Sequence, residues 1–185
     1  METLETIGKR ASLKRRLTAR DIEKEKIALI LDAARMAPSA HNMQPWRFII
    51  VKGEKNIETV VTKAFEEPNQ VVKEAPVLIV ACANPSDDMN RDGKEYYLFD
   101  VGLAVENMLL AATELGLATH PMIDVDEVEL KKVLHMPDEV RFVVATPLAY
   151  PAGGSYEEAA RERLDQRNRK SREEVVYSNV WGEPF

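Results

Sequence analysis

Stretches of helical and of extended hydrophobic spacing alternate along the chain, and no internal repeat interrupts them. A first helical face comprises Ile27, Ile30, Leu31 and Ala34. Thr18 followed by Asp21 resembles a capping box, so we expect this helix to open near Thr18. Pro38 should end the helix, and a turn-rich loop with two prolines should follow over residues 37–46.

Three mostly apolar runs predict buried strands at residues 47–52, 76–83 and 141–148. The second lies in the longest apolar run, Ala75 to Ala83, and is expected to be central. Two shorter helices should lie between the strands. The first has the apolar stripe Ile57, Val60, Val61, Ala64 and Phe65, and the second opens at Asp126 with Glu129 and ends near Met136. Another short helix is expected from Tyr156.

Residues 94–115 predict a long helix that is apolar on most of its surface, with Gly116 as its C-terminal stop. Such a helix must be buried on several sides. The segment 173–185 is different, because its large apolar side chains lie beyond any helix or hairpin that would bury them locally. They are Val175, Val176, Tyr177, Val180, Trp181 and Phe185. We expect this tail to pack on a second copy of the chain.

The amino-acid composition is that of an ordinary globular protein. With 185 residues, 45% hydrophobic and 30% charged, the chain is expected to form one globular domain over 1–185. No apolar run approaches the ~20 residues of a membrane span, and no apolar leader follows the N-terminus. The single cysteine, Cys82, lies in a predicted buried strand and allows no internal disulfide. A cytoplasmic location without a membrane partner is expected.

Charge is segregated within a net of −6. Residues 9–20 carry six basic side chains and no acid, and residues 161–172 carry six more. The remaining 161 residues have a net charge of −16, which argues against a broad nucleic-acid surface. Two compact basic clusters suit a small anion. The alternative is that both clusters are solvated faces that pair with the acidic remainder.

Conventional catalytic motifs are missing from the sequence. His41, His120 and His135 have no second histidine or carboxylate at metal-ligand spacing, so no metal site is expected. The nucleophile elbow, the phosphate loop and the glycine-rich dinucleotide fingerprint are likewise missing. If the protein is an enzyme, a bound cofactor should supply the chemistry.

Several segments of the sequence resemble those of one protein family. The arm KRASLK at residues 9–14, the loop APSAHNMQPWRF at 37–48 and the stretch DVGLAVENM at 100–108 resemble the nitroreductase family of FMN-dependent oxidoreductases. The likeness continues through Leu115-Gly116-Leu117, Ala149-Tyr150-Pro151 and the tail to Gly182. It implies an α+β fold whose central, mostly antiparallel sheet is flanked by helices. It also implies a homodimer in which the C-terminal tails are exchanged.

The resemblance implies a set of cofactor-binding residues. Arg10, Ser12, Arg167 and Arg169 match positions that hold the FMN phosphate, and paired guanidinium groups suit a phosphate dianion. Ala11 stands in the same arm where many members have a second basic residue. Lys14, in place of the commoner Arg, matches a cation at the pyrimidine edge of the flavin, where it should favour the reduced form.

Further positions are implied around the flavin ring. Pro38, Ser39 and Asn42 match a loop that the second subunit lays against the ring. In the segment Pro121, Met122, Ile123 and Asp124, backbone N–H groups should approach the ring, with Pro121, Ile123 and Asp124 as contacts. Asn69 matches a family amide near the flavin.

By resemblance, the activity is ping-pong transfer of two electrons from NADH or NADPH, through flavin N5, to a nitroaromatic, quinone or similar small-molecule acceptor. Ene reduction and flavin fragmentation stay open within the superfamily. The lid residues of its deiodinase branch have no evident counterpart. From other classes, a flavoprotein for storage or redox sensing and a nucleic-acid-binding module remain as alternatives.

Overall fold

A computed structural model describes residues 2–185 of the chain. Its centre is a three-stranded antiparallel sheet in the order β1-β2-β5, made of Trp46–Lys52, Val77–Ala83 and Arg141–Leu148. In the middle strand every residue is buried. Val80 of β2 faces Ile49 of β1 and Ala145 of β5 in this register. This confirms the three predicted strands and the central place of the second. The observed ends differ from the predicted ones by at most one residue.

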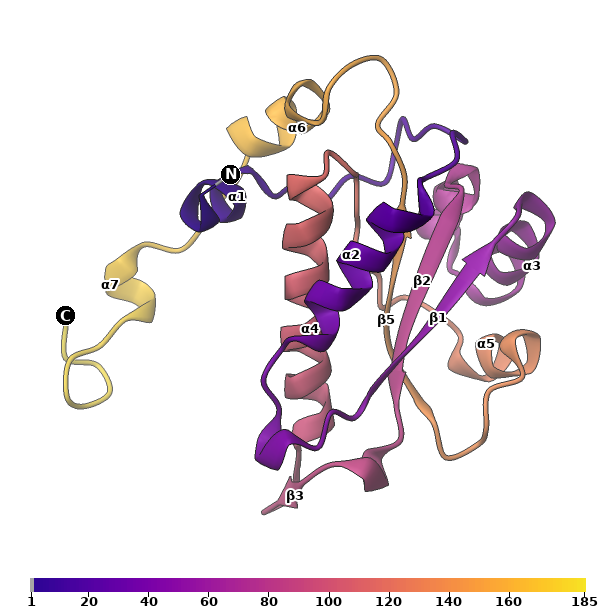
Figure 1. Ribbon diagram of the computed structural model, residues 1–185. Helices are drawn as coiled ribbons and strands as arrows, with labels where there is room; N and C mark the ends of the chain where they lie inside the picture. The colour runs from indigo at the N-terminus through magenta and orange to yellow at the C-terminus, as the bar shows by residue number, and fades with distance from the viewer. Residues whose placement is uncertain (1) are drawn as a thin grey trace.

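The helices form a layer on each face of the sheet (Figure 1). Helices α2 (Lys24–Arg35) and α4 (Tyr96–Glu114) pack with Val77, Ile79 and Ala81 of β2. Helices α3 (Glu54–Ala64) and α5 (Glu127–Leu134) pack with the alternate residues Leu78, Val80 and Cys82. Successive strand side chains point to opposite faces, so one continuous apolar strand supplies both halves of the core. Burial raises the pKa of the Cys82 thiol, which is therefore unreactive.

Helix α4 ends as its sequence predicts. Gly116 has φ +74°, and the following N–H of Leu117 donates to the carbonyl of Ala112 at 2.8 Å. A glycine adopts this left-handed conformation without a steric cost, which explains the stop. The helix starts at Tyr96 and not at Lys94, because Lys94–Glu95 forms strand β4 paired with β3 (Asn90–Arg91). One face of α4 also stays exposed.

The expected capping box at Thr18 and Asp21 is wrong. Helix α2 begins at Lys24, and its N-cap Glu23 makes no side-chain cap hydrogen bond. The Thr18 hydroxyl and backbone N–H both donate instead to the carbonyl of Tyr150, at 3.0 and 2.9 Å. Thr18 thus fastens the incoming chain to the segment after β5. At α5 the prediction is confirmed, since the Asp126 carboxylate accepts from two backbone N–H groups of the first turn.

The remaining helices are short. Helix α6 (Tyr156–Asp165) confirms the predicted helix and opens with a capping box of Ser155 and Glu158. Helix α1 (Thr3–Lys9) was not predicted, because it has about two turns and its apolar residues Leu4 and Ile7 are exposed, so no buried apolar face marks it in the sequence. The 3-10 turns η1, η2 and η3 span Ala40–Asn42, Glu67–Glu74 and Pro85–Asp87, and α7 spans Arg172–Val175.

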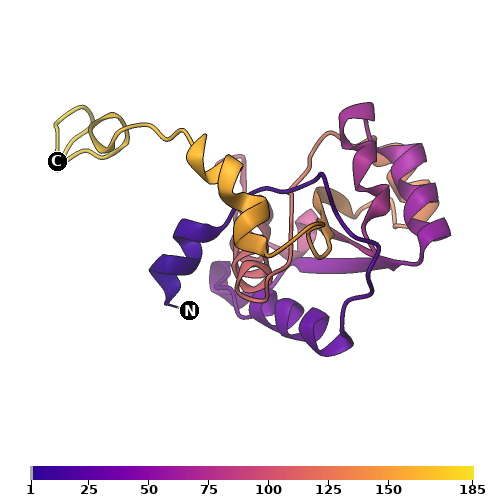
Figure 2. The same ribbon diagram turned by 90° about the horizontal axis from the view of Figure 1, so that it is seen from above.

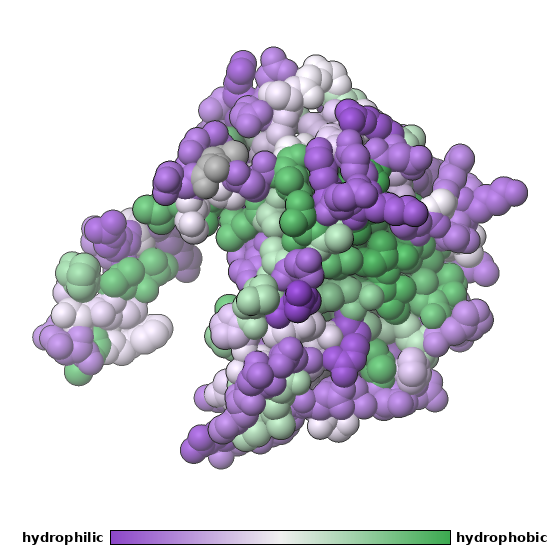
Figure 3. Space-filling view, in the orientation of Figure 1, coloured by the Kyte–Doolittle hydropathy of each residue, from purple (hydrophilic) through white to green (hydrophobic). Residues whose placement is uncertain are grey.

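The C-terminal tail extends away from the body of the molecule (Figures 1 and 2). Its apolar side chains include Trp181, which is 89% exposed, and Phe185, which is 82% exposed. The ring of Trp181 lies against that of Tyr177, with 4.9 Å between centroids. Figure 3 shows apolar residues both on this tail and on the body near β1. Among the described residues, no helix combines the length and hydropathy needed to cross a membrane.

Candidate functional site

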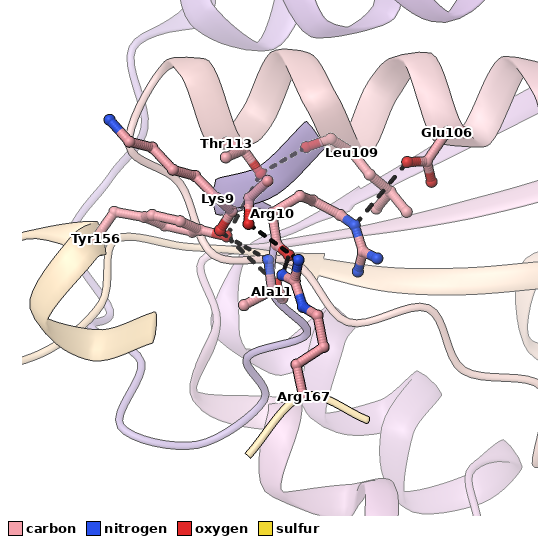
Figure 4. A network of polar contacts seen from close by, with 9 residues as sticks. Lys9, Arg10, Ala11, Glu106, Leu109, Thr113, Tyr156 and Arg167 are labelled. Atoms are coloured by element: carbon pink, nitrogen blue, oxygen red, sulfur yellow. Dashed lines mark hydrogen bonds and ion pairs between the residues drawn. The ribbon is translucent and has the colours of Figure 1, made fainter. Parts of the chain in front are cut away.

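The N-terminal arm, residues 10–14, is an extended segment held in place by backbone contacts. The N–H of Leu13 donates to the carbonyl of Thr119 at 2.7 Å, and Ser12 forms a parallel bridge with the same residue. The N–H of Ala11 donates to the hydroxyl of Tyr156 at 2.8 Å (Figure 4). Because Ala11 is buried, this hydroxyl satisfies a donor that water cannot reach. The arm therefore presents its side chains from a fixed backbone.

Arg10 and Arg167 connect the arm to two different helices. Arg10 extends toward α4, where its Nε lies 3.9 Å from a carboxylate oxygen of Glu106. Arg167 follows α6 and donates to the carbonyls of Gly8, at 2.9 Å, and Arg10 (Figure 4). Its guanidinium thus joins the segment after α6 to the arm. The two basic clusters of the sequence meet here, although they lie at opposite ends of the chain.

A cavity of about 210 Å³ opens where these segments meet. The side chains that line it carry four guanidinium groups, a hydroxyl and an imidazole. The lining residues are Arg10, Ala11, Ser12, His120, Arg163, Arg167 and Arg169. None of these lining residues is acidic, so the cavity has the donors and the charge for a phosphate-sized dianion. Five of the sequence-predicted residues are brought together at this cavity.

Two of the lining residues were missed by sequence reasoning. Arg163 lies on α6 within the second basic run, where nothing distinguished it from neighbouring surface arginines. His120 was not selected, because no second histidine or carboxylate lies at metal-ligand spacing from it. Its position directly before Pro121 was the only available signal, since the resemblance implied flavin contacts from there onward.

His120 lines the cavity as a half-buried residue. Its Nδ1 is buried and has no hydrogen-bond partner among the described residues. The backbone N–H of His120 donates to the hydroxyl of Thr146 in β5 at 2.9 Å, which fixes its position. Burial, together with the charges of Lys14 and Arg163, lowers the pKa of the imidazole to about 4. The ring is therefore neutral at neutral pH.

Lys14, Asn69 and Asp124 form a second cluster beside the arm. The ammonium of Lys14 donates to the Oδ1 of Asn69 at 2.8 Å and to the carbonyl of Pro68 at 3.0 Å. The amide of Asn69 in turn donates to the Asp124 carboxylate at 3.4 Å. Asn69 is buried and Asp124 is exposed. Three predicted ring contacts from distant parts of the sequence are thus joined in one hydrogen-bonded row.

The other predicted ring contacts lie at two places. Pro121 and Ile123 are exposed beside this row, and the Ile123 side chain is 71% accessible. Pro38, Ser39 and Asn42 belong to the loop that contains η1, at the opposite end of α4 from the arm (Figure 1). There the N–H of Ala40 donates to the buried carboxylate of Asp100 at 2.7 Å. One chain does not bring this loop to its own basic cavity.

The loop with η1 is held in a turn-rich conformation. His41, Asn42 and Gln44 all have positive φ, at 48°, 58° and 52°. The Ser39 hydroxyl accepts from the N–H of Gln44 at 2.9 Å and closes the turn. This explains why two prolines and small polar residues occur in the segment.

In residues 2–185, no group of three or more His, Cys, Asp and Glu side chains is placed to hold a metal ion.

Comparisons with known proteins find relatives that are named for redox activities. A relative named as an NADH dehydrogenase/NAD(P)H nitroreductase, from Methanothermobacter thermautotrophicus, is 34% identical over 157 residues, covering 82% of this chain and 78% of that protein. An iodotyrosine deiodinase from Thermotoga neapolitana is 33% identical over 166 residues, covering 75% of this chain and 86% of the relative. The two relatives are thus named for different activities, nitroreduction and deiodination.

Solved structures match over the whole fold. A nitroreductase family protein from Clostridium novyi NT superposes with a TM-score of 0.77 at 33% identity, covering 100% of this chain and 97% of that one. A nitroreductase from Desulfovibrio desulfuricans, solved in complex with FMN, has a TM-score of 0.79 at 24% identity, with 98% of each chain covered. The sequence model of the nitroreductase family matches residues 7–71 and 63–150. This protein, an α+β chain with an antiparallel sheet between helical layers, belongs to the nitroreductase family.

Proposed function

We propose that this oxidoreductase binds FMN with its phosphate in the cavity of Arg10, Ser12 and the C-terminal arginines. The observation that carries the proposal is the convergence of two distant basic runs on one cavity with no acidic lining residue. Guanidinium groups form charge-assisted hydrogen bonds to phosphate oxygens, and Ser12 adds a hydroxyl donor. The Desulfovibrio desulfuricans relative, which was solved with FMN, supports the same cofactor.

The row of Lys14, Asn69 and Asp124 gives the flavin ring a polar border. FMN, when bound, supplies the two-electron chemistry, accepting a hydride at N5 from NADH or NADPH and reducing a nitroaromatic, quinone or similar acceptor in a ping-pong cycle. The Lys14 ammonium contributes positive charge beside the pyrimidine edge, and Asn69 holds that ammonium in position. The backbone N–H groups of 123 and 124 face the ring's N5 and O4 side in this proposal.

The protein acts as a homodimer in this proposal. Three exposed features support it: the apolar tail, Leu98 and Phe99 on α4 (48% and 61% exposed), and the half-buried edge strand β1. Covering them with a second copy removes apolar area from water at about 25 cal/mol per Å². The loop of Pro38, Ser39 and Asn42 is then placed on the partner's flavin, because it lies at the far end of α4 from its own cavity.

The relatives do not narrow the acceptor, since both a nitroreductase and a deiodinase are similar to this chain. Ene reduction and flavin fragmentation also use a reduced flavin. The principal alternative is a flavoprotein that stores FMN or senses redox state without useful turnover. These activities differ in what reduces the flavin and what reoxidises it.

Two measurements test the proposal. The purified protein is expected to be yellow, with non-covalent FMN at about one per chain, and added NADH or NADPH should bleach the flavin band in anaerobic stopped-flow. A panel of nitroaromatic, quinone, iodotyrosine and enone acceptors should then restore the band at different rates. A colourless protein that does not take up FMN would refute the cofactor assignment. Bound flavin that neither nucleotide reduces would favour storage or sensing.

A further inference from the structure

His120 stands apart from the other residues that line the basic cavity. The lining side chains that carry charge are guanidinium groups, which keep their protons at every relevant pH. The imidazole of His120 is the one lining group whose ordinary pKa lies near neutral pH, so its charge can respond to what the cavity binds. Its Nδ1 is buried without a hydrogen-bond partner among the described residues, although its backbone is fixed by Thr146.

The charged side chains that line the cavity with His120 are all cationic, and one of them, Arg10, lies 3.9 Å from the Glu106 carboxylate of α4. Arg10 and Lys14 approach from the arm, Arg163 from α6, and Arg167 and Arg169 from the segment that follows α6. The neighbouring strand β5 contributes the uncharged Thr146. Without a bound anion, the burial of the ring and the charges of Lys14 and Arg163 lower the pKa of His120 to about 4. A second positive charge on the ring is disfavoured as long as no anion is present.

A bound phosphate reverses this balance. A dianion within the cavity attracts a proton onto the imidazole by the same Coulomb interaction with which the arginines repel it. The imidazolium has two N–H donors, so protonation also gives the ring a donor toward a phosphate oxygen whichever nitrogen is protonated first. The burial of Nδ1 strengthens this attraction, because charges interact more strongly where water is partly excluded.

We propose that His120 is a proton-linked ligand of the FMN phosphate, neutral in the empty cavity and an imidazolium when the phosphate is bound. The inference rests on the proposed function, since it requires FMN in this cavity. Binding then takes up one proton from solvent for each FMN. The affinity for FMN should fall as pH rises through the pKa that the imidazole has in the complex, with Kd rising by up to about tenfold per pH unit.

The phosphate of FMN can release a proton on binding, which is the opposite of the proton uptake expected at His120. The two contributions can be separated by the choice of pH. The phosphate's second ionisation has a pKa of about 6, and a cationic cavity favours the dianion, so binding releases a proton below that pH. At pH 7 and above, free FMN is already almost wholly dianionic. Proton uptake measured at pH 7 therefore reports on protein groups. The matched control is His135, the exposed C-cap residue of α5, which lies outside every flavin contact proposed above.

The experiment is calorimetric titration of FMN into flavin-free full-length protein at pH 7 in buffers with different heats of ionisation. Wild type and His135→Gln are expected to take up about one proton per FMN, and His120→Gln close to none. Equal proton uptake by wild type and His120→Gln would overturn the inference and leave the proposed function intact. Failure of wild type to bind FMN would overturn both.

A second measurement keeps the inference testable if His120→Gln does not bind FMN. The histidine ring resonances of the wild-type complex, assigned with the His41→Gln and His135→Gln variants, report the protonation of His120 directly. An imidazolium at pH 7 in the complex and a neutral ring without FMN are expected. A ring that stays neutral at pH 6 with FMN bound would overturn the inference.

Discussion

The Lys14 ammonium donates a 2.8 Å hydrogen bond to the side-chain carbonyl of Asn69, and through Asn69 it is joined to Asp124. Lys14 comes from the arm, Asn69 from η2 and Asp124 from the segment after α4. The two hydrogen bonds each span 55 positions of sequence. A long flexible side chain is thus held in one place, which a cation must be if it is to tune a cofactor.

Replacing Lys14 by Met should lower the two-electron midpoint potential of the bound flavin. The substitution keeps the volume and removes the positive charge that stabilises the reduced form. We expect a fall of about 30 mV, which corresponds to about 1.4 kcal/mol for a two-electron couple. A spectroscopic redox titration measures it. The Lys14→Arg variant keeps a positive charge, so its midpoint potential should stay close to that of wild type. An unchanged midpoint potential in Lys14→Met would show that the ammonium does not face the ring.

Arg10 and Arg163 should each contribute to FMN affinity, whereas their neighbours should not. Arg10→Ala and Arg163→Ala each remove a cation from the cavity lining, and each is expected to weaken binding by about 1.5 to 3 kcal/mol. Arg16→Ala and Arg161→Ala are matched controls, because neither residue lines the cavity. Flavin fluorescence quenching gives the four dissociation constants. Equal effects of all four would mean that only a diffuse positive field acts.

Tyr156→Phe should destabilise the fold by about 1 to 3 kcal/mol, the cost of leaving a buried donor unsatisfied. The lost hydroxyl accepts from the N–H of the buried Ala11 at 2.8 Å, so the variant leaves that N–H without its partner. Urea unfolding at fixed chain concentration measures the difference. Tyr177→Phe is the control, since its hydroxyl makes an exposed 3.1 Å hydrogen bond. A loss no larger than the control's would mean that water replaces the hydroxyl.

Asp88→Asn should make the protein less sensitive to alkaline pH. Burial and the nearby carboxylate of Asp100 raise the pKa of Asp88, and its Oδ2 has no partner among the described residues. The folded state therefore holds a proton that the unfolded state loses, and wild type loses stability as pH rises from about 4 through the raised pKa. An asparagine does not ionise.

The free energy of unfolding, measured in urea at pH 4 and pH 8, checks the Asp88 prediction. The free energy of unfolding of Asp88→Asn should exceed that of wild type by more at pH 8 than at pH 4. Asp92→Asn, at an exposed position in the adjoining turn, should show no such difference. A gain of equal size at both pH values would mean that Asp88 does not keep its proton on folding.

Truncation after Ser171 should yield monomer or aggregate and release FMN, although Arg10, Ser12, Arg167 and Arg169 all remain. The deletion removes the exposed apolar side chains of Val175, Val180, Trp181 and Phe185. Sedimentation and the flavin content of the eluted protein measure the outcome. A control chain that ends after Trp181 retains most of the apolar tail. A truncated chain that stays dimeric with stoichiometric FMN would contradict the exchanged tail and the shared site.

Hydrophobic periodicity predicted the elements that form the core. Strand β2 and helix α4 were found because burial on both faces or on most sides leaves a long apolar run. Local capping signals were less reliable. Asp126 caps its helix, but Thr18 and Asp21 do not, because the Tyr150 carbonyl competes for the Thr18 donors across 132 positions of sequence. No local rule contains that distant acceptor.

The site was predictable only in part, for a related reason. Periodicity and composition revealed the two basic runs, and the family resemblance selected Arg10, Ser12, Arg167 and Arg169 among them. Arg163 was not selected, because its role depends on which side of α6 faces the arm. His120 was overlooked because a lone histidine carries no pattern. Its role depends on the cations that the fold gathers around it.

The buried position of Cys82 makes it a reporter on unfolding. It is the only cysteine of the chain and lies in the middle strand, where the residue is 2% exposed and burial raises the pKa of its thiol. A thiol reagent can modify it only when the sheet opens, so the modification rate in native buffer follows the rare opening of the core. An added surface cysteine could therefore be labelled selectively, without first replacing Cys82.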